Sequence, residues 1–272
     1  MGSMQSELQK NPKSKILKRG YINIYSKLTL QEKRQIYYKT LYKKQNPSWD
    51  ESLVYLSKKF KSLIKKDIKL VDVGCGNGNY LIDENRKNIS WAAGVDIDKQ
   101  AVMKNQCLDE VVIGDISNLP YDANYFDVAT SLWVFEHLEN PEKVVEEVYR
   151  VLKPKGKFLF VTPNYNFLPL RLIKYIEFFN INYLINRWLF GRKEGDIFKT
   201  FYKANSVKLL KRLLKNKFDI IELRTNYDPS YTSFNLITFK LSNTLNSICS
   251  KLGLNISHPH IIGITQKRSP TF

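Results

Sequence analysis

The stretch Val71-Asp72-Val73-Gly74-Cys75-Gly76-Asn77-Gly78-Asn79 decides the fold of this chain. A short apolar run ends in an aspartate and is followed by three glycines at alternate positions. Glycine adopts tight turns at no steric cost and puts no side chain between the backbone and an approaching ligand. The pattern predicts a buried strand that passes through a tight turn into a helix, with a ligand against the turn.

Strands and helices are expected to alternate around this turn. The predicted strands are Lys69–Val73, Trp91–Val95, Glu110–Ile113, Phe126–Thr130, Lys157–Thr162, Phe218–Leu223 and His260–Lys267, and the predicted helices are 79–87, 99–105, 141–152 and 205–216. Asn140-Pro141 is typical of a helix start, because asparagine caps helices and proline suits their first turn. Strands separated by helices indicate a parallel, doubly wound α/β sheet.

The alternation breaks after Pro163 and divides the chain. We expect a helical N-terminal arm (4–66), a cofactor-binding core (67–165), a lid and acceptor insertion (166–216), and a return to the last two core strands (217–272) with a second insertion at 226–256. Within the arm, Ser48 is predicted to cap a helix that begins at Trp49, because apolar residues then recur at helical spacing.

The net charge of the 272 residues is +17, from 43 Lys and Arg against 26 Asp and Glu. Such a charge suits a nucleic-acid or anionic-membrane partner, or else solvated lysine faces. The lysines are spread from Lys10 to Lys267, which favours solvated faces. Three cysteines without metal-ligand spacing indicate a reducing compartment and no metal site. With no long apolar run, the expected location is cytoplasmic.

Acidic residues at successive strand ends predict the chemistry of the ligand. Asp96, eighteen residues past Gly78, can accept hydrogen bonds from both ribose hydroxyls. Asp115 can accept from an exocyclic amine while the amide of Ile116 donates to a ring nitrogen, a combination that selects adenine. Asp72 would repel a diphosphate and attract a cationic amino-acid group. An adenosyl amino acid is therefore expected rather than a dinucleotide.

A set of motifs over roughly residues 67–165 resembles the class I S-adenosylmethionine-dependent methyltransferases. The motifs are Asp72-Val73-Gly74-Cys75-Gly76-Asn77-Gly78, Gly94-Val95-Asp96-Ile97, Gly114-Asp115 with Leu119-Pro120, Phe126-Asp127-Val128, Phe135-Glu136-His137-Leu138 and Arg150-Val151-Leu152-Lys153-Pro154-Lys155-Gly156. The resemblance implies a seven-stranded, mostly parallel Rossmann-like sheet whose last strand runs antiparallel. The sequence departs at Lys155, where the family more often has glycine, and the turn is expected to form through Gly156.

The same resemblance implies the cofactor S-adenosylmethionine, with S-adenosylhomocysteine as product. The implied cofactor-binding residues are Asp72, Gly74, Cys75, Gly76, Asn77, Asp96, Ile97, Asp115, Ile116, Ser131, Leu132 and Trp133. Gly74 and Gly76 would pass under the methionine moiety, and the last three residues would line the methyl-donor end. An acidic, aromatic-lined pocket suits a cofactor that carries a sulfonium and an ammonium.

His137 is the candidate catalytic residue, because it follows the strand end that faces the donor. A general base contributes about 10²- to 10⁴-fold in rate when the acceptor is an alcohol. A helix-packing histidine that never meets substrate is an equally open alternative. Glu136 could orient His137 or bind a metal, although a structural glutamate is favoured and no metal is expected. His258 and His260 have no partner visible in the sequence.

The acceptor is expected to lie against the insertions. Asp196-Ile197-Phe198-Lys199-Thr200-Phe201-Tyr202-Lys203-Ala204-Asn205 resembles a stretch of bacterial and archaeal methyltransferases associated with polysaccharide and glycolipid assembly. That resemblance implies that Asp196, Thr200, Tyr202 and Lys203 border the acceptor pocket; the alternative is a lid that packs on the core. The aromatic run Phe167–Phe190 suits a buried lid helix, which is favoured, or a surface that contacts a lipid-linked acceptor at the inner face of the membrane.

The predicted function is methyl transfer from S-adenosylmethionine to an oxygen or nitrogen of a small molecule, with a sugar or lipid-linked glycan intermediate as the expected acceptor. An RNA or tRNA methyltransferase is the main alternative, motivated by the charge. The segment after the fourth strand lacks the Asn/Asp-Pro-Pro-aromatic pattern of exocyclic-amine enzymes, and no Pro-Cys nucleophile is present. A non-catalytic cofactor-binding module and, more distantly, a dehydrogenase remain as further alternatives.

Overall fold

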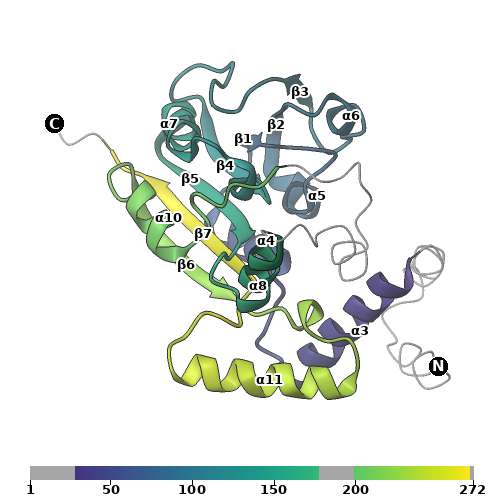
Figure 1. Cartoon of the computed structure of the whole chain (residues 1–272). Coiled ribbons are helices and arrows are strands. Elements are labelled where there is room, and N and C mark those ends of the chain that lie inside the picture. The colour runs from purple at the N-terminus through teal and green to yellow at the C-terminus, as the bar shows by residue number, and fades with distance from the viewer. Residues whose placement is uncertain (1–27, 178–198, 270–272) are drawn as a thin grey trace.

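The computed structural model describes residues 28–177 and 199–269, and its centre is a seven-stranded sheet in the order β3-β2-β1-β4-β5-β7-β6 (Figure 1). The strands are β1 (Ile68–Val73), β2 (Ile89–Asp96), β3 (Glu110–Ile113), β4 (Phe126–Leu132), β5 (Leu152–Pro163), β6 (Phe218–Asn226) and β7 (His260–Lys267). Paired strands are parallel except where β7 runs antiparallel to β5 and β6. The predicted sheet and its antiparallel last strand are confirmed.

Helices cover both faces of the sheet and bury its central strands. One face packs against α7 (Pro141–Val151) and α10 (Val207–Leu214), and the other packs against α4 (Ser52–Leu63) and α5 (Tyr80–Asn85). β1 and β4 lie mid-sheet and are buried on both sides along most of their length. The short elements α6 (Lys99–Val102), η2 (Arg86–Asn88) and η3 (Phe135–His137) connect the strands.

Residues 28–66 of the N-terminal arm contain two helices, and one helix start differs from expectation. Helix α3 (Leu30–Gln45) begins with a capping box between Thr29 and Glu32. Helix α4 begins at Ser52, so the predicted start at Trp49 with a Ser48 cap is wrong. Trp49 instead donates its indole N–H to the carbonyl oxygen of Tyr227 at 2.8 Å. This contact ties the segment before α4 to the C-terminal insertion.

Strand β5 begins earlier than the sequence indicated. Leu152, rather than Lys157, is its first residue and pairs with Phe126 of β4. The turn expected at Gly156 is formed by its neighbour, because Lys155 takes the left-handed conformation with φ of 63°. Gly156 serves a different need: a Cβ there would lie 2.8 Å from the carbonyl oxygen of Lys153.

The two insertions add helices at the carboxyl-end side of the sheet. Helix α8 (Leu168–Glu177) follows β5, while η5 (Pro229–Tyr231) and α11 (Leu236–Lys251) separate β6 from β7. Helix α11 is the outermost element in Figure 1 and lies beside α3 rather than on the sheet. Within the described residues, no helix is both long and apolar enough to cross a bilayer.

Candidate cofactor and active site

A cavity of about 690 Å³ lies where the carboxyl ends of β1, β2, β3 and β4 meet. Its lining includes Gly74, Cys75, Gly76, Asn77 and Gly78 after β1, Asp96 and Ile97 after β2, Asp115 and Ile116 after β3, and Leu132, Trp133, Val134 and His137 after β4. Parallel strands bring their carboxyl ends to one edge, and ligands of open α/β sheets bind there. Most of the predicted cofactor residues are therefore brought together.

The backbone of the glycine turn is shaped by Gly74 and Gly76. Gly74 has φ of 81°, and a Cβ there would collide with the side chain of Val134. Gly76 has φ of 45°, and a Cβ there would meet nothing within 4 Å. The turn is anchored below by the carbonyl oxygen of Val95, which accepts from Gly74 N at 2.9 Å and from Cys75 N at 3.2 Å. Gly76 thus presents bare backbone to the cavity.

Asp72 supports this turn from beneath and does not line the cavity. Its carboxylate is buried and accepts hydrogen bonds from Asn79 Nδ2 at 2.8 Å and Thr130 Oγ1 at 2.7 Å. Asn79 in turn caps α5 by accepting from Leu81 N. Burial raises the pKa of Asp72 to about 7, against the lowering effect of its two hydrogen-bond donors. The side chain therefore fixes the turn and the start of α5 to β4.

Asp96 is the carboxylate that the cavity wall presents at the end of β2. Its Oδ2 accepts from Gly76 N and its Oδ1 accepts from Asp98 N, each at 2.8 Å. A carboxylate oxygen has further lone pairs, so both oxygens retain acceptor capacity for a ligand. Asp98 caps α6 by accepting from Gln100 N and Ala101 N, as its position before that helix implies.

A flat and largely apolar slot adjoins Asp96. Ile97 is 74% exposed, an unusual degree for isoleucine, and shares the cavity lining with Ile116 and Asp115. Hydrogen bonds from Ser117 hold the pKa of Asp115 below its ordinary value, so this carboxylate stays charged. An exposed aliphatic side chain beside a charged acceptor is suited to a planar ring with a polar edge.

The wall after β4 is formed by Leu132 and Trp133, while Ser131 lies outside it. The Ser131 hydroxyl is buried and has no hydrogen-bond partner within the described part of the chain. Trp133 adopts a left-handed φ of 60°, which is uncommon for a bulky residue. Its ring lies against that of His260, with centroids 4.7 Å apart.

His260 joins Trp133 to the N-terminal arm and to the second insertion, a connection that the sequence did not reveal. His260 is hydrogen-bonded through Nδ1 to Ser52 Oγ and through Nε2 to Tyr231 Oη, each at 2.9 Å. Burial lowers the pKa of His260 to about 4, so the ring is neutral. These partners are far apart in the chain and become neighbours only through the fold.

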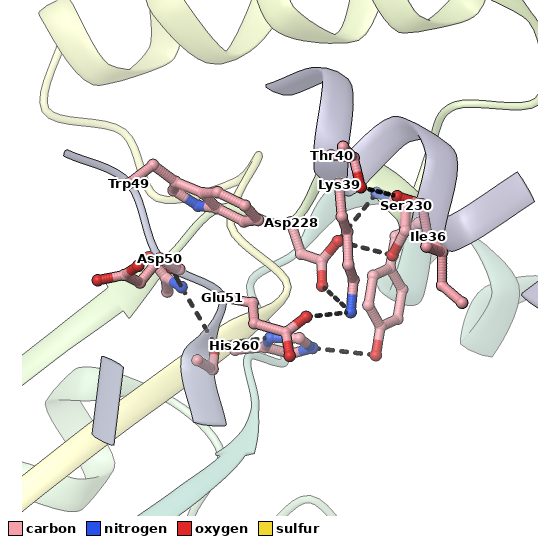
Figure 2. Close-up of polar contacts among 12 residues, drawn as sticks. Ile36, Lys39, Thr40, Trp49, Asp50, Glu51, Asp228, Ser230 and His260 are labelled. Atoms are coloured by element: carbon pink, nitrogen blue, oxygen red, sulfur yellow. Dashed lines mark hydrogen bonds and ion pairs between the residues drawn. The ribbon is translucent and has the colours of Figure 1, made fainter. Parts of the chain in front are cut away.

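Beside this histidine lies a second connection between the arm and the insertion (Figure 2). The ammonium of Lys39 lies 2.8 Å from Glu51 Oε2 and 3.3 Å from Asp228 Oδ2. The two carboxylates raise the pKa of Lys39 although burial opposes them. Leu53, which follows Ser52 in α4, lines the cavity together with Tyr80. The arm thus completes the cavity wall, which no motif had indicated.

His137 lies on the cavity wall in η3, as predicted. Its Nδ1 is 2.9 Å from the carbonyl oxygen of Lys199, which can only accept, so Nδ1 carries the proton and Nε2 is the basic nitrogen. Nε2 is 3.9 Å from Glu136 Oε1. Glu136 is buried and accepts from Thr162 Oγ1 at 3.2 Å, which indicates an orienting or structural carboxylate.

Of the predicted acceptor residues that the structure describes, Thr200 and Tyr202 lie in a segment held beside η3, and Thr200, Tyr202 and Lys203 do not line the cavity. Phe201 N and Tyr202 N donate to the carbonyl oxygen of Glu136 at 2.7 and 3.2 Å, so this segment is held beside η3. Thr200 Oγ1 accepts from Lys174 Nζ at 3.0 Å. Lys203 is exposed and lines a separate small groove beside α10, and Asp196 lies outside the described residues.

Comparison with known proteins agrees with this geometry. Residues 71–160 match the family described as "Methyltransferase domain". A sterol 4-C-methyltransferase of Caenorhabditis elegans is 29% identical over 104 residues (35% of this chain, 31% of its own length), and a ubiquinone biosynthesis O-methyltransferase of Coxiella burnetii is 32% identical over 105 residues (36% and 44%). The matched segment therefore spans less than half of either relative.

A solved structure with a similar fold extends the likeness beyond the matched segment. It is a methyltransferase in complex with the Haloferax volcanii Trm112 methyltransferase activator, with a TM-score of 0.55 and 16% identity, and the alignment covers 90% of this chain and all of that one. The likeness at this identity concerns the fold. The family match indicates an S-adenosylmethionine-dependent methyltransferase domain over residues 71–160, and this segment supplies most of the lining of the cavity at the β1–β4 edge.

Proposed function

We propose that the protein transfers the methyl group of S-adenosylmethionine to an oxygen or nitrogen of a small acceptor, with a sugar or lipid-linked glycan intermediate as the expected class. The observation that carries the proposal is the pairing of Asp96 with the exposed backbone of Gly76 in one cavity whose wall also holds His137. A cofactor cradle and a candidate base are then within one site.

The residues present suit the cofactor. Asp96 would accept from the ribose hydroxyls, and Ile97 would pack on the adenine that Asp115 and the amide of Ile116 recognise. Gly74, Cys75, Gly76 and Asn77 would border the methionine portion, with Leu132 and Trp133 at the methyl end. The bare backbone at Gly76, where a Cβ would meet nothing, supports this assignment. We propose that the buried Asp72 and Ser131 act indirectly, by positioning the glycine turn and the end of β4.

The cofactor, held by Asp96 and the glycine turn, would supply a methyl group on a sulfonium and would leave as a neutral thioether. For an alcohol acceptor, His137 Nε2 would take the hydroxyl proton as the acceptor oxygen bonds to that methyl group. The Lys199 carbonyl holds the tautomer that this requires. Alignment by the cavity wall contributes on the order of 7–11 kcal/mol to such a reaction, and a base contributes less.

A small acceptor is supported by the cavity, because about 690 Å³ has to hold both the cofactor and the reacting part of the acceptor. The relatives' names refer to a sterol, to ubiquinone biosynthesis and to a tRNA, so they fit both acceptor classes. Thr200, Tyr202, Lys203 and Asp196 remain our candidates for the outer acceptor contacts, through the attachment of their segment to Glu136.

The net charge of +17 makes RNA the second candidate acceptor. An enzyme that neutralises phosphates binds RNA with an affinity that falls steeply as salt rises, whereas an enzyme for a small glycan or quinone does not. Fluorescence titration of tRNA between 50 and roughly 300 mM salt separates the two candidates.

The proposed function is tested by calorimetry followed by a transfer assay. We expect S-adenosylhomocysteine to bind and NAD⁺ not to bind. Radiolabelled S-adenosylmethionine is then supplied with panels of glycans, isoprenoid-linked sugars, quinols and tRNA, and label transfer identifies the acceptor class. Binding of NAD⁺ in place of the homocysteine compound would overturn the proposal, and donor binding without transfer to any panel would indicate a binding module.

A further inference from the structure

Helix α11 packs on the protein through its polar side. Tyr227 Oη lies 2.7 Å from Ser242 Oγ and donates to Asn243 Oδ1 at 2.9 Å. Asn246 is buried on the same side. The only large apolar side chain that α11 buries here is Phe239, which stacks on Tyr38 of α3 with centroids 5.2 Å apart. This arrangement reverses the usual one, in which a surface helix buries its apolar side.

The opposite side of α11 carries an exposed aliphatic stripe, which we call the outer face. Its members follow one another at intervals of four, four, three and four residues and therefore share one arc of the helix. They are Ile237 (71% exposed), Leu241 (59%), Leu245 (59%), Ile248 (49%) and the C-cap residue Leu252 (66%). A contiguous surface of this kind on an otherwise polar protein marks an interaction site.

The outer face continues into a groove shared with the start of α8. The groove has a volume of about 310 Å³ and is lined by Leu241 and Leu245 on one side and by Phe167, Leu168 and Pro169 on the other. Leu168 and Leu172 of α8 are themselves about half exposed. The apolar surface therefore spans two helices and is broader than one stripe.

The charged residues of α11 and of the chain that follows it are all positive. Residues 229–272 contain no Asp or Glu, whereas α8 carries one acidic residue, Glu177, at its last position. Lys240 and Lys251 each follow an outer-face isoleucine by three residues and are exposed, so both lie along the same edge of the stripe. Arg171 of α8 is exposed as well. An aliphatic stripe edged by lysines is the pattern of helices that lie in the interface of an anionic membrane.

We propose that the outer face of α11 docks on the surface of an anionic lipid bilayer, with its aliphatic side chains among the acyl chains and Lys240 and Lys251 at the headgroups. The outer face lies on α11, whereas the sequence raised a membrane contact at Phe167–Phe190; the start of that segment, up to Leu172, adjoins the outer face, and residues 178–190 lie outside the described residues. The proposal concerns binding and does not depend on the acceptor of the methyl group.

A second copy of the chain is the less favoured occupant. Two outer faces brought together would place the lysines of one copy near those of the other, and residues 229–272, which include α11, contain no carboxylate to pair with them. Each chain also carries a net charge of +17, which opposes self-association at low salt. A bilayer with negative headgroups both buries the aliphatic side chains and pairs with the lysines.

Vesicle sedimentation of the full chain tests the proposal. We expect binding to phosphatidylcholine vesicles that contain phosphatidylglycerol, and at least tenfold weaker binding to phosphatidylcholine alone. The double variant L241S/L245S should lose at least tenfold in partitioning, because two exposed leucines no longer enter the interface. K240Q/K251Q should lose about tenfold on anionic vesicles only.

Matched substitutions outside α11 serve as controls. I221S removes an aliphatic side chain of similar exposure (47%) from β6, and K208Q/K211Q removes two exposed lysines from α10. Both should bind vesicles like the wild type. Equal losses in these controls, or equal binding to neutral and anionic vesicles, would overturn the proposal. So would light scattering that shows a dimer which L241S/L245S dissociates, because a second copy would then cover the outer face.

Discussion

The carboxylate of Asp96 accepts a hydrogen bond from the backbone N–H of Gly76, with 2.8 Å between Oδ2 and nitrogen. One bond thereby joins the glycine turn after β1 to the end of β2. The same carboxylate holds Asp98 N through its other oxygen. Asp96 is thus positioned by two backbone groups before any ligand arrives, which reduces the entropy lost on binding.

Replacing Asp96 by alanine should weaken binding of S-adenosylhomocysteine by about 10²-fold or more. Two hydrogen bonds from ribose hydroxyls to a charged group would be lost, and each contributes roughly 1.5–3 kcal/mol. Titration calorimetry measures the change, and Asp83→Ala, an exposed carboxylate outside the cavity, is the control. Affinity equal to that of the wild type would exclude the ribose contact.

Replacing His137 by glutamine should lower turnover by about 10²- to 10⁴-fold while leaving donor affinity within a few-fold, because a base acts on the acceptor proton rather than on the donor. Glutamine can still donate to the Lys199 carbonyl, so the local backbone is preserved. Single-turnover transfer to the identified acceptor measures the rate. A rate close to wild type would assign His137 to packing.

The sequence was sufficient for those features that depend on local patterns. The glycines after β1 and the acidic residues at the ends of β2 and β3 predicted the turn and most of the cavity lining, because parallel strands fix where their ends meet. The arm could not be placed in this way. Ser52 reaches His260 across 208 positions of the sequence, and Leu53 reaches the cavity because α4 packs beside α5, and no local pattern indicates either contact.

Asp72 shows why a residue type at a strand end does not by itself give its role. Carboxylates at 72 and 96 follow equivalent patterns, yet the side chain of Asp96 reaches the cavity wall, whereas that of Asp72 lies beneath the turn. In the β1–β2 register Asp72 lies opposite Gly94, so Asp72 is inside β1, two positions before the level of Asp96, which is the last residue of β2. Asn79 and Thr130, which hold Asp72, are identified only by the fold.

Asp72→Asn should remove a pH dependence of stability. The pKa of Asp72 is about 7 in the folded protein against 3.8 as its ordinary value, so between these values the folded chain holds a proton that the unfolded chain releases. The contribution of this proton to the free energy of unfolding therefore falls by on the order of 4 kcal/mol as pH rises from about 4 to 7. Urea unfolding from pH 5 to 8 should show the variant gaining on the wild type with rising pH; parallel curves would contradict the assignment.

His260→Gln should remove a second pH dependence of stability, one in which stability falls in acid. Its pKa is about 4 when folded against an ordinary 6.5, so in this interval the unfolded chain binds the extra proton and stability falls as the solution is acidified. Across this pH interval the effect on the free energy of unfolding is on the order of 3 kcal/mol. Glutamine can replace the hydrogen bonds to Ser52 and Tyr231 but does not titrate. The same urea series, extended to pH 4.5, should show the variant losing less stability in acid than the wild type; an equal loss would contradict a neutral buried His260.

The turn at Lys155 and Gly156, within β5, allows two substitutions that together test its backbone conformation. Gly156→Ala should destabilise the protein by about 1–3 kcal/mol, because the new Cβ would lie 2.8 Å from the Lys153 carbonyl oxygen and 3.2 Å from that of Asp127. Lys155→Gly should be neutral or stabilise by up to about 1 kcal/mol, because φ of 63° is unfavourable for lysine and free for glycine. Thermal and urea unfolding measure both changes. If Gly156→Ala were harmless and Lys155→Gly costly, position 156 would not be crowded and residue 155 would not be left-handed, and both assignments would be wrong.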